Sequence, residues 1–212
     1  QNIQKGNLKI LFYNKKNFIK YLHCIVIGIP IWYVVGLLVM NSKDNFAPLM
    51  GINDIENGQA VMYTYIGLSV GDLISGVLSQ WLRSRKKVVG LYLLFTLVLI
   101  TSFLFFMDGV SKDSYYLMCF LLGTATGYWA LFVSIAAEQF GTNIRSTTAN
   151  TIPNFVRGSV NLIMLGFGIL TALNLGDAIS AYIVGLIFIL LALYSLSQLK
   201  ETFGKDLDYL ET

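Results

Sequence analysis

Two charged side chains interrupt otherwise apolar stretches of the sequence, and these residues have the clearest capacity for chemistry. Asp72 lies near the middle of the apolar stretch 60–82, and Arg157 lies within the stretch 147–173. An ionisable group in hydrocarbon is costly, so it needs a partner or a function. We interpret Asp72 as a carboxylate that binds and releases a proton or cation, or as a hydrogen-bonded residue of a helix bundle. Arg157 is either a binding group for an anion or an arginine whose side chain reaches back to the membrane surface.

Polar and aromatic residues at similar depth in the other apolar stretches are candidates for binding a small solute. Such a site combines apolar walls with a few oriented hydrogen-bonding groups. Gly28 and Pro30 precede two of the candidates and favour a break in the helix there. For each aromatic residue, packing within a bundle is the alternative interpretation. The candidates are Trp32, Tyr33, Thr124, Tyr128, Trp129, Asn154 and Asn161.

Six apolar stretches must position these residues. With 55% hydrophobic and 13% charged residues, the 212-residue chain cannot cover a water-soluble surface, so it must face lipid. A helix needs about 20 apolar residues to cross a bilayer. Small residues recur every four positions from Gly67 to Ser79, which predicts that this helix packs closely on another. The sequence predicts an all-α, polytopic membrane protein with transmembrane helices at 21–42, 60–82, 88–107, 115–137, 147–173 and 178–199.

The basic residues are distributed unevenly between the two sides of the predicted membrane. Cytoplasmic loops retain lysine and arginine, and six spans put both termini on one side. Only Lys43 and Lys112 fall on the other side. We therefore predict an integral, multi-pass protein of the cell membrane with both termini in the cytoplasm. The basic residues on the predicted cytoplasmic side are Lys5, Lys9, Lys15, Lys16, Lys20, Arg83, Arg85, Lys86, Lys87, Arg145, Lys200 and Lys205.

Several classes of function fit the sequence poorly. The cations flank spans and do not form one face with interleaved aromatic residues, which argues against nucleic-acid binding. Cys24 and Cys119 lie in apolar stretches, so we expect packing roles, without a disulfide or a metal site. An intramembrane hydrolase needs a nucleophile with a base or paired aspartates, and neither pattern is visible, so we expect no enzymatic activity and no cofactor. A six-helix channel or a structural membrane module stays open as the alternative.

Three patches at predicted cytoplasmic positions resemble motifs of the major facilitator superfamily. Residues 136–145, AAEQFGTNIR, are similar to the E-x-F-P-T-x-x-R signature after the tenth helix of sugar porters and organic-ion transporters, with Gly141 in place of proline. Residues 201–207, ETFGKDL, resemble the P-E-T-x-G-x-x-L that closes the twelfth helix, with Lys200 in place of proline. Residues 76–87, GVLSQWLRSRKK, are similar in degenerate form to the G-x-L-x-D-R-x-G-R-R loop.

The resemblance implies that the chain is the C-terminal six-helix half of such a transporter. It implies secondary transport of a small organic solute, such as an organic anion or a sugar, by alternating access and with coupling to a proton or cation. Arg157 follows Arg145 by twelve positions, the spacing at which an arginine faces the substrate in the eleventh helix of organic-anion transporters. An N-terminal half is then expected before residue 1, with 1–20 as a cytoplasmic lead-in and 200–212 as a cytoplasmic tail.

The resemblance also implies a gate at the cytoplasmic helix ends. Carboxylates and arginines on adjacent ends can form an ion-pair network that acts as a latch. In the family such a network holds the helices together in the outward-open state and releases them on inward opening. The latch residues are Glu138, Arg145, Glu201, Arg83 and Arg85.

Overall fold

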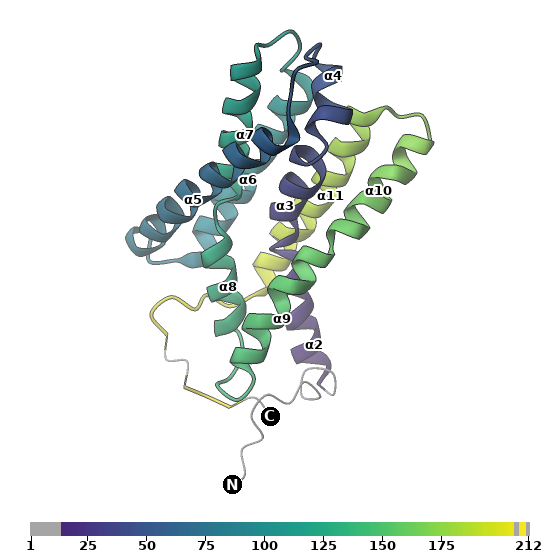
Figure 1. Cartoon of the computed structure of the whole chain (residues 1–212). Coiled ribbons are helices and arrows are strands. Elements are labelled where there is room, and N and C mark those ends of the chain that lie inside the picture. Colours follow the sequence, from purple (N-terminus) through teal and green to yellow (C-terminus); the bar gives the residue numbers. More distant parts are fainter. Residues whose placement is uncertain (1–13, 206–207, 211–212) are drawn as a thin grey trace.

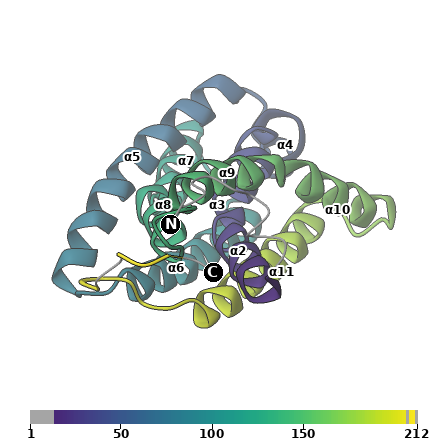
Figure 2. The same ribbon diagram turned by 90° about the horizontal axis from the view of Figure 1, so that it is seen from below.

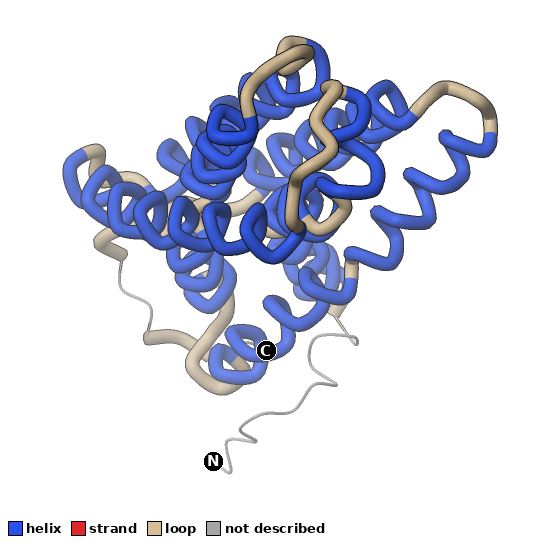
Figure 3. Tube along the Cα trace, turned by 45° about the horizontal axis from the view of Figure 1, so that its top comes forward, coloured by secondary structure: helices blue, strands red, loops and turns tan. Residues whose placement is uncertain are grey.

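The computed structural model describes residues 14–205 and 208–210, and this part of the chain is all-helical (Figures 1 and 3). Six helical segments are long and apolar enough to cross a membrane, so the predicted all-α class and the predicted number of candidate spans are confirmed. Lys5 and Lys9 of the predicted basic set lie outside the described residues. The six segments are Lys15–Val39, Asn57–Trp81, Arg85–Phe105, Lys112–Glu138, Arg145–Ala172 and Asp177–Gln198.

Some spans are single helices and others are made of shorter pieces. The first span contains α2 (Lys15–Val26), α3 (Ile29–Trp32) and the π-helix η1 (Tyr33–Val39). The loop after it holds η2 (Ser42–Phe46) and α4 (Ala47–Leu49). The remaining spans are α5 (Asn57–Trp81), α6 (Arg85–Phe105), α7 (Lys112–Thr126) with α8 (Trp129–Glu138), α9 (Arg145–Gly158) with α10 (Val160–Ala172), and α11 (Asp177–Gln198).

Each helix begins before the apolar stretch that predicted it, because polar capping residues set several of the starts. The side chain of Asn14 accepts a hydrogen bond from the amide of Lys16 at 3.0 Å and caps α2. Ser84 caps α6 in the same way, accepting from the amide of Lys87 at 3.2 Å. Such caps satisfy amides that have no partner within the helix. Hydropathy therefore marks the apolar part of each span, and the caps mark where the helix starts.

The helices form one bundle with a buried cluster of apolar side chains in each half of its length. One cluster lies around η1, α7 and the start of α11, and the other lies around α2, α8 and the end of α11. α11 packs on α6 and α2, while α5 lies against α7 (Figures 1 and 2). We call the end of the bundle where α2, α6 and α9 begin the basic end, because Lys15, Arg85 and Arg145 lie there.

α5 and α7 approach each other through glycine residues on both helices. A Cβ atom added at Gly67 would lie 2.0 Å from the carbonyl oxygen of Phe120. One added at Gly123 would lie 2.0 Å from the carbonyl oxygen of Thr64. The two backbones are thus in direct contact, which confirms the close packing predicted from the small residues that begin at Gly67.

Substitution of Gly67 by alanine is expected to destabilise the bundle, because backbone atoms of α7 must move to admit the methyl group. Overpacking of this kind costs about 1–3 kcal/mol. Gly76 lies on the same helix with open space around its Cα, so Gly76→Ala is the matched control. The control should leave stability unchanged or raise it by up to about 1 kcal/mol through helix propensity. Unfolding midpoints in detergent compare the two variants, and equal midpoints would contradict the backbone contact.

The second and fifth spans are the least covered by the rest of the bundle. In each of these two spans, 22% of the most apolar 18-residue stretch is buried inside the bundle, against 72% in the first span. Figure 2 places α5 and α10 at the periphery on different sides, with α9 between them. These spans therefore present the largest surfaces to lipid or to another protein.

Candidate functional site

Irregular turns interrupt three of the six spans near their middle. The fourth span is broken at 127–128, between α7 and α8. The first is irregular at 27–28, between α2 and α3, where Pro30 has no amide to donate to the preceding turn. The fifth is irregular at Ser159, between α9 and α10. We call the region around these three turns the junction. Interrupted helices leave backbone groups available for binding.

Direct contacts bring the three turns together. A Cβ atom added at Gly28 would lie 2.9 Å from the side chain of Val156, near the end of α9. The buried hydroxyl of Tyr128 donates to the carbonyl of Ile27 at 3.1 Å. That carbonyl is available because the amide of Ile31 donates to the carbonyl of Gly28 instead. Tyr128, a predicted binding residue, thus ties the break in the fourth span to the turn in the first.

Asp72 lies at the junction and caps the helix that follows the break. Its Oδ1 accepts a hydrogen bond from the backbone amide of Ala130, in the first turn of α8, at 3.1 Å. The first amides of a helix lack partners within it, and a carboxylate is favoured at that positive end. Next to it, the hydroxyl of Tyr92 donates to the carbonyl of Gly71 at 2.9 Å. Asp72 therefore joins α5 to α8.

Arg157 reaches the same place from α9. Its guanidinium carbon lies 5.4 Å from the ring centroid of Trp129, the first residue of α8, in a cation–π arrangement. The arginine is exposed. Within the described residues no ion pair joins Arg157 to Asp72. Trp32 packs against the adjoining core, and its buried indole Nε1 has no hydrogen-bond partner among the described residues.

The other predicted binding residues are divided between the junction and the packed core. Asn154 and Asn161 are exposed and flank Arg157 along α9 and α10, so they extend its polar face. Thr124 is half-buried in the last turns of α7, where its hydroxyl bonds to a carbonyl of the same helix. The structure places Tyr33 away from the junction. Its hydroxyl is buried between η1 and α11 and donates to the carbonyl of Ala181 at 2.7 Å.

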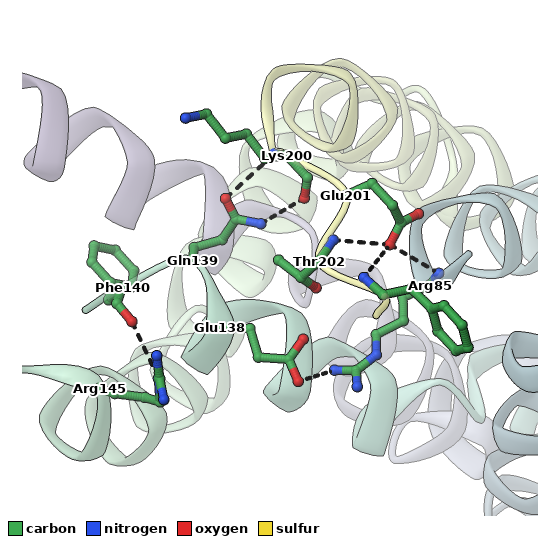
Figure 4. A network of polar contacts seen from close by, with 9 residues as sticks. Arg85, Glu138, Gln139, Phe140, Arg145, Lys200, Glu201 and Thr202 are labelled. Carbon is green, nitrogen blue, oxygen red and sulfur yellow. Dashed lines mark hydrogen bonds and ion pairs between the residues drawn. The ribbon is translucent and has the colours of Figure 1, made fainter. Parts of the chain in front are cut away.

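Three of the five predicted latch residues, Arg85, Glu138 and Glu201, lie in a network at the basic end that joins α6, α8 and the tail (Figure 4). Arg85 forms an ion pair with Glu138, the last residue of α8. Glu201 accepts hydrogen bonds from the hydroxyl of Ser84 and from the backbone amides of Arg85 and Lys86, both at 3.2 Å. The tail carboxylate therefore caps the start of α6.

Three further hydrogen bonds hold the tail to the end of α8. Gln139 donates from Nε2 to the carbonyl of Lys200 at 2.7 Å, and its Oε1 accepts from the Lys200 amide at 3.3 Å. The hydroxyl of Tyr209 donates to the carbonyl of Gln139 at 2.8 Å. The side chains of Gln139 and Tyr209 and the backbone of Lys200 thus hold the tail after α11 against the end of α8.

Two of the predicted latch residues have different surroundings. Arg145 donates from Nε to the carbonyl of Phe140 at 3.2 Å and stiffens the turn between α8 and α9, while Glu138 pairs with Arg85. Arg83 is exposed in the turn between α5 and α6, with a positive φ of 47°.

Ser84 and Gln139 also belong to this network, and neither was predicted from the sequence. A local signal existed for Ser84, because a serine directly before the helical stretch that starts at Arg85 is a favoured capping residue. Gln139 carried no such signal. Its partners lie sixty-one positions away, in the backbone of Lys200, and residue type alone does not reveal a backbone partner.

Acidification is expected to weaken the network through Glu201. Burial alone would raise the pKa of this carboxyl, but the hydrogen bonds from the Ser84 hydroxyl and from backbone amides outweigh burial, so the pKa lies below its ordinary value. Because the folded-state pKa is lower than the unfolded one, the stabilisation is complete above about pH 4.3 and is lost as the pH falls through the folded-state pKa.

Glu201→Gln removes this titration, so its unfolding temperature should fall less than that of the wild type between about pH 7 and about pH 3. Asp54→Asn, which alters an exposed carboxylate at the opposite end of the bundle, is the control and should keep the wild-type slope. Thermal scans in detergent across this range measure both. If the unfolding temperature of Glu201→Gln falls with pH as steeply as that of the wild type, the capping bonds contribute nothing to stability.

The chain matches no model of a known protein family, no curated protein and no solved structure. The resemblance to the major facilitator superfamily thus rests on the three sequence patches, and any function must be argued from the geometry.

Proposed function

We propose that this chain forms one six-helix half of a secondary transporter of the major facilitator type, which moves a small organic solute by alternating access. The junction is the observation that carries the proposal. Three interrupted spans meet there, and Asp72, Trp129 and Arg157 supply a carboxylate, an aromatic face and a cation at mid-depth. Solute and ion sites in secondary transporters are built from interrupted helices near the bilayer midplane.

The exposed polar face of the fifth span supports a second half. Asn150, Asn154, Arg157 and Asn161 follow one another at helical spacing and are all exposed. Facing lipid, such a face would be costly, whereas an aqueous cavity or a facing bundle removes that cost. The expected partner is the N-terminal six-helix bundle of the same transporter.

The network at the basic end supports a gate that opens and closes. Glu138 and Glu201 reach Arg85 and the start of α6 through an ion pair and backbone hydrogen bonds, which can break and form again without unfolding any helix. Under this proposal the basic end faces the cytoplasm, in keeping with its lysines and arginines.

A carboxylate and an arginine at one junction suggest the solute class and the coupling. A guanidinium presents a planar fork of donors that matches a carboxylate, which favours an organic anion, with a sugar as the alternative. Asp72 is the group that would take up the coupling proton or cation.

Thiol labelling tests whether the junction faces a water-filled cavity. Cys24 and Cys119 are buried, and their replacement by alanine gives a background without reactive thiols. Asn154→Cys in that background should react with a membrane-impermeant thiol reagent in the full-length protein. Leu165→Cys, an exposed apolar position further along α10, should stay unlabelled as a lipid-facing control. Absence of labelling at Asn154→Cys would contradict an aqueous transport path.

Uptake separates the transporter from the channel. Liposomes that contain the full-length protein should take up radiolabelled benzoate or glucose saturably, and unlabelled solute inside should accelerate entry. Acceleration by solute on the opposite side requires alternating access. Conductance without saturation or counterflow would favour the six-helix channel.

A further inference from the structure

A separate cavity lies at the basic end, away from the junction. Its volume is about 660 Å³, and it lies between the start of α2, the end of α8 and the tail after α11. Figure 2 views the bundle from this end. The latch carboxylates Glu138 and Glu201 contribute to one wall of the cavity, but neither the transport proposal nor the latch uses its interior.

Lysine side chains dominate the lining of the cavity. Four lysines contribute, namely Lys16, Lys20, Lys200 and Lys205. Lys20 lies over the ring of Phe140, 4.5 Å from its centroid. Among the described residues, no carboxylate pairs with the ammonium groups of the other three. Such a concentration of cations in a concave, partly enclosed site attracts anions more strongly than the same cations on an open surface.

The two carboxylates in the lining do not cancel this charge. Glu138 is already paired with Arg85. Glu201 accepts hydrogen bonds from the amides of Thr202 and Phe203, at 3.0 and 3.1 Å, in addition to those from the start of α6. Both carboxylates are therefore already bound by neighbouring groups, and the charge of the three exposed lysines, Lys16, Lys200 and Lys205, stays available to a ligand.

Two buried polar atoms in the lining lack partners. The hydroxyl of Thr202, a residue that is 6% exposed, has no hydrogen-bond partner among the described residues, and neither does Oε2 of Glu138. Figure 4 shows both side chains beside the tail. Buried polar atoms are nearly always satisfied, so an orphan pair in a cavity points to a bound group. The hydroxyl can donate to an anion, and the carboxylate oxygen can accept from a ligand hydroxyl.

From this lining we infer that the cavity binds a phosphate ester that carries free hydroxyl groups. The three exposed lysines hold the phosphate, Thr202 donates to one of its oxygens, and Glu138 accepts from a hydroxyl of the ester. A phosphatidylglycerol headgroup and soluble glycerol phosphate share this chemistry. Because α2 and the tail both line the cavity, an occupant would bind them together.

Binding to the purified full-length protein tests the inference, with dioctanoyl phosphatidylglycerol and glycerol phosphate as probes and dioctanoyl phosphatidylcholine as the control probe. A Lys16→Gln/Lys200→Gln variant should weaken the affinity for the phosphate probes by about tenfold or more. Both lysines are exposed, so the variant should fold. Lys43→Gln/Lys112→Gln removes the same charge at the opposite end and should bind as the wild type does. Thr202→Val keeps the side-chain shape and should also weaken binding.

The two phosphate probes identify the source of the ligand. Tighter binding of phosphatidylglycerol than of glycerol phosphate assigns the site to a lipid headgroup, and equal affinities assign it to a soluble ester. Either result supports the inference. It is overturned if neither probe binds, if phosphatidylcholine binds as well as phosphatidylglycerol, or if the two double variants lose affinity equally.

Discussion

Replacement of Asp72 by asparagine is expected to abolish accumulation of solute against its gradient while leaving exchange across the membrane intact. The asparagine oxygen can still accept the hydrogen bond from the Ala130 amide, so α8 should stay capped. The amide cannot bind or release a proton, and coupling to the gradient should be lost. Uptake by full-length protein in liposomes, with and without a proton gradient, measures accumulation, and counterflow measures exchange.

Two further variants separate coupling from structure. Asp72→Ala removes the proton site and the cap together, so it should lose accumulation and also unfold at a lower temperature. Ser69→Ala is the neighbouring control, because the Ser69 hydroxyl is exposed and bonds to the carbonyl of Tyr65 in its own helix. If Asp72→Asn concentrates solute as the wild type does and only Asp72→Ala is impaired, Asp72 is a helix cap without a part in coupling.

Substitutions of Arg157 should show the next largest effect, and they should depend on the charge of the solute. Arg157→Ala is expected to weaken binding of an anionic solute by about 10- to 100-fold, the range expected for a charge-assisted hydrogen bond. Arg157→Lys should weaken it less, because lysine keeps the charge without the planar fork. Both variants should fold, since the side chain is exposed and its contact is with the face of Trp129. Solute affinities from uptake assays provide the measurement.

The alternatives for Arg157 predict different patterns. An arginine that only anchors α9 at the membrane surface would tolerate lysine fully and would treat anionic and neutral solutes alike. A charge partner of Asp72 would be rescued in the double variant Asp72→Asn/Arg157→Gln. Wild-type uptake of organic anions by Arg157→Ala would eliminate the anion site.

The spans could be predicted from the sequence because lipid imposes one simple requirement, a long apolar helix. The four-residue spacing from Gly67 likewise predicted close packing, since only small residues allow two backbones to touch. The identity of the partner helix, α7, could not be predicted in the same way. It depends on Gly123, which is far from Gly67 in the sequence. The spacing of small residues does not indicate which helix packs against which.

The site residues were harder to predict because their partners are distant in sequence or are backbone groups. Glu138 and Arg145 lie close together in the chain, yet Glu138 pairs with Arg85, which the fold brings to it. Asp72 was recognised from its charge and depth, but its contact with the α8 amide depends on a break that hydropathy does not reveal. Tyr33 had the depth of a binding residue, and packing against Gly185 placed it in the core.

Because of the break between α7 and α8, Asp72 is a mechanical link between α5 and α8. α7 is locked to α5 by glycine contacts, whereas α8 begins anew beyond the break and is tied back to α5 through the carboxylate of Asp72. Under the proposed transport mechanism, α8 would pivot at its first turn as a rigid helix about 15 Å long, with Glu138 and Gln139 at its far end. Protonation of Asp72 would replace the charge-assisted hydrogen bond at this pivot by a weaker neutral one. Under that mechanism, proton uptake at Asp72 in mid-membrane would displace the far end of α8 at the basic end of the bundle.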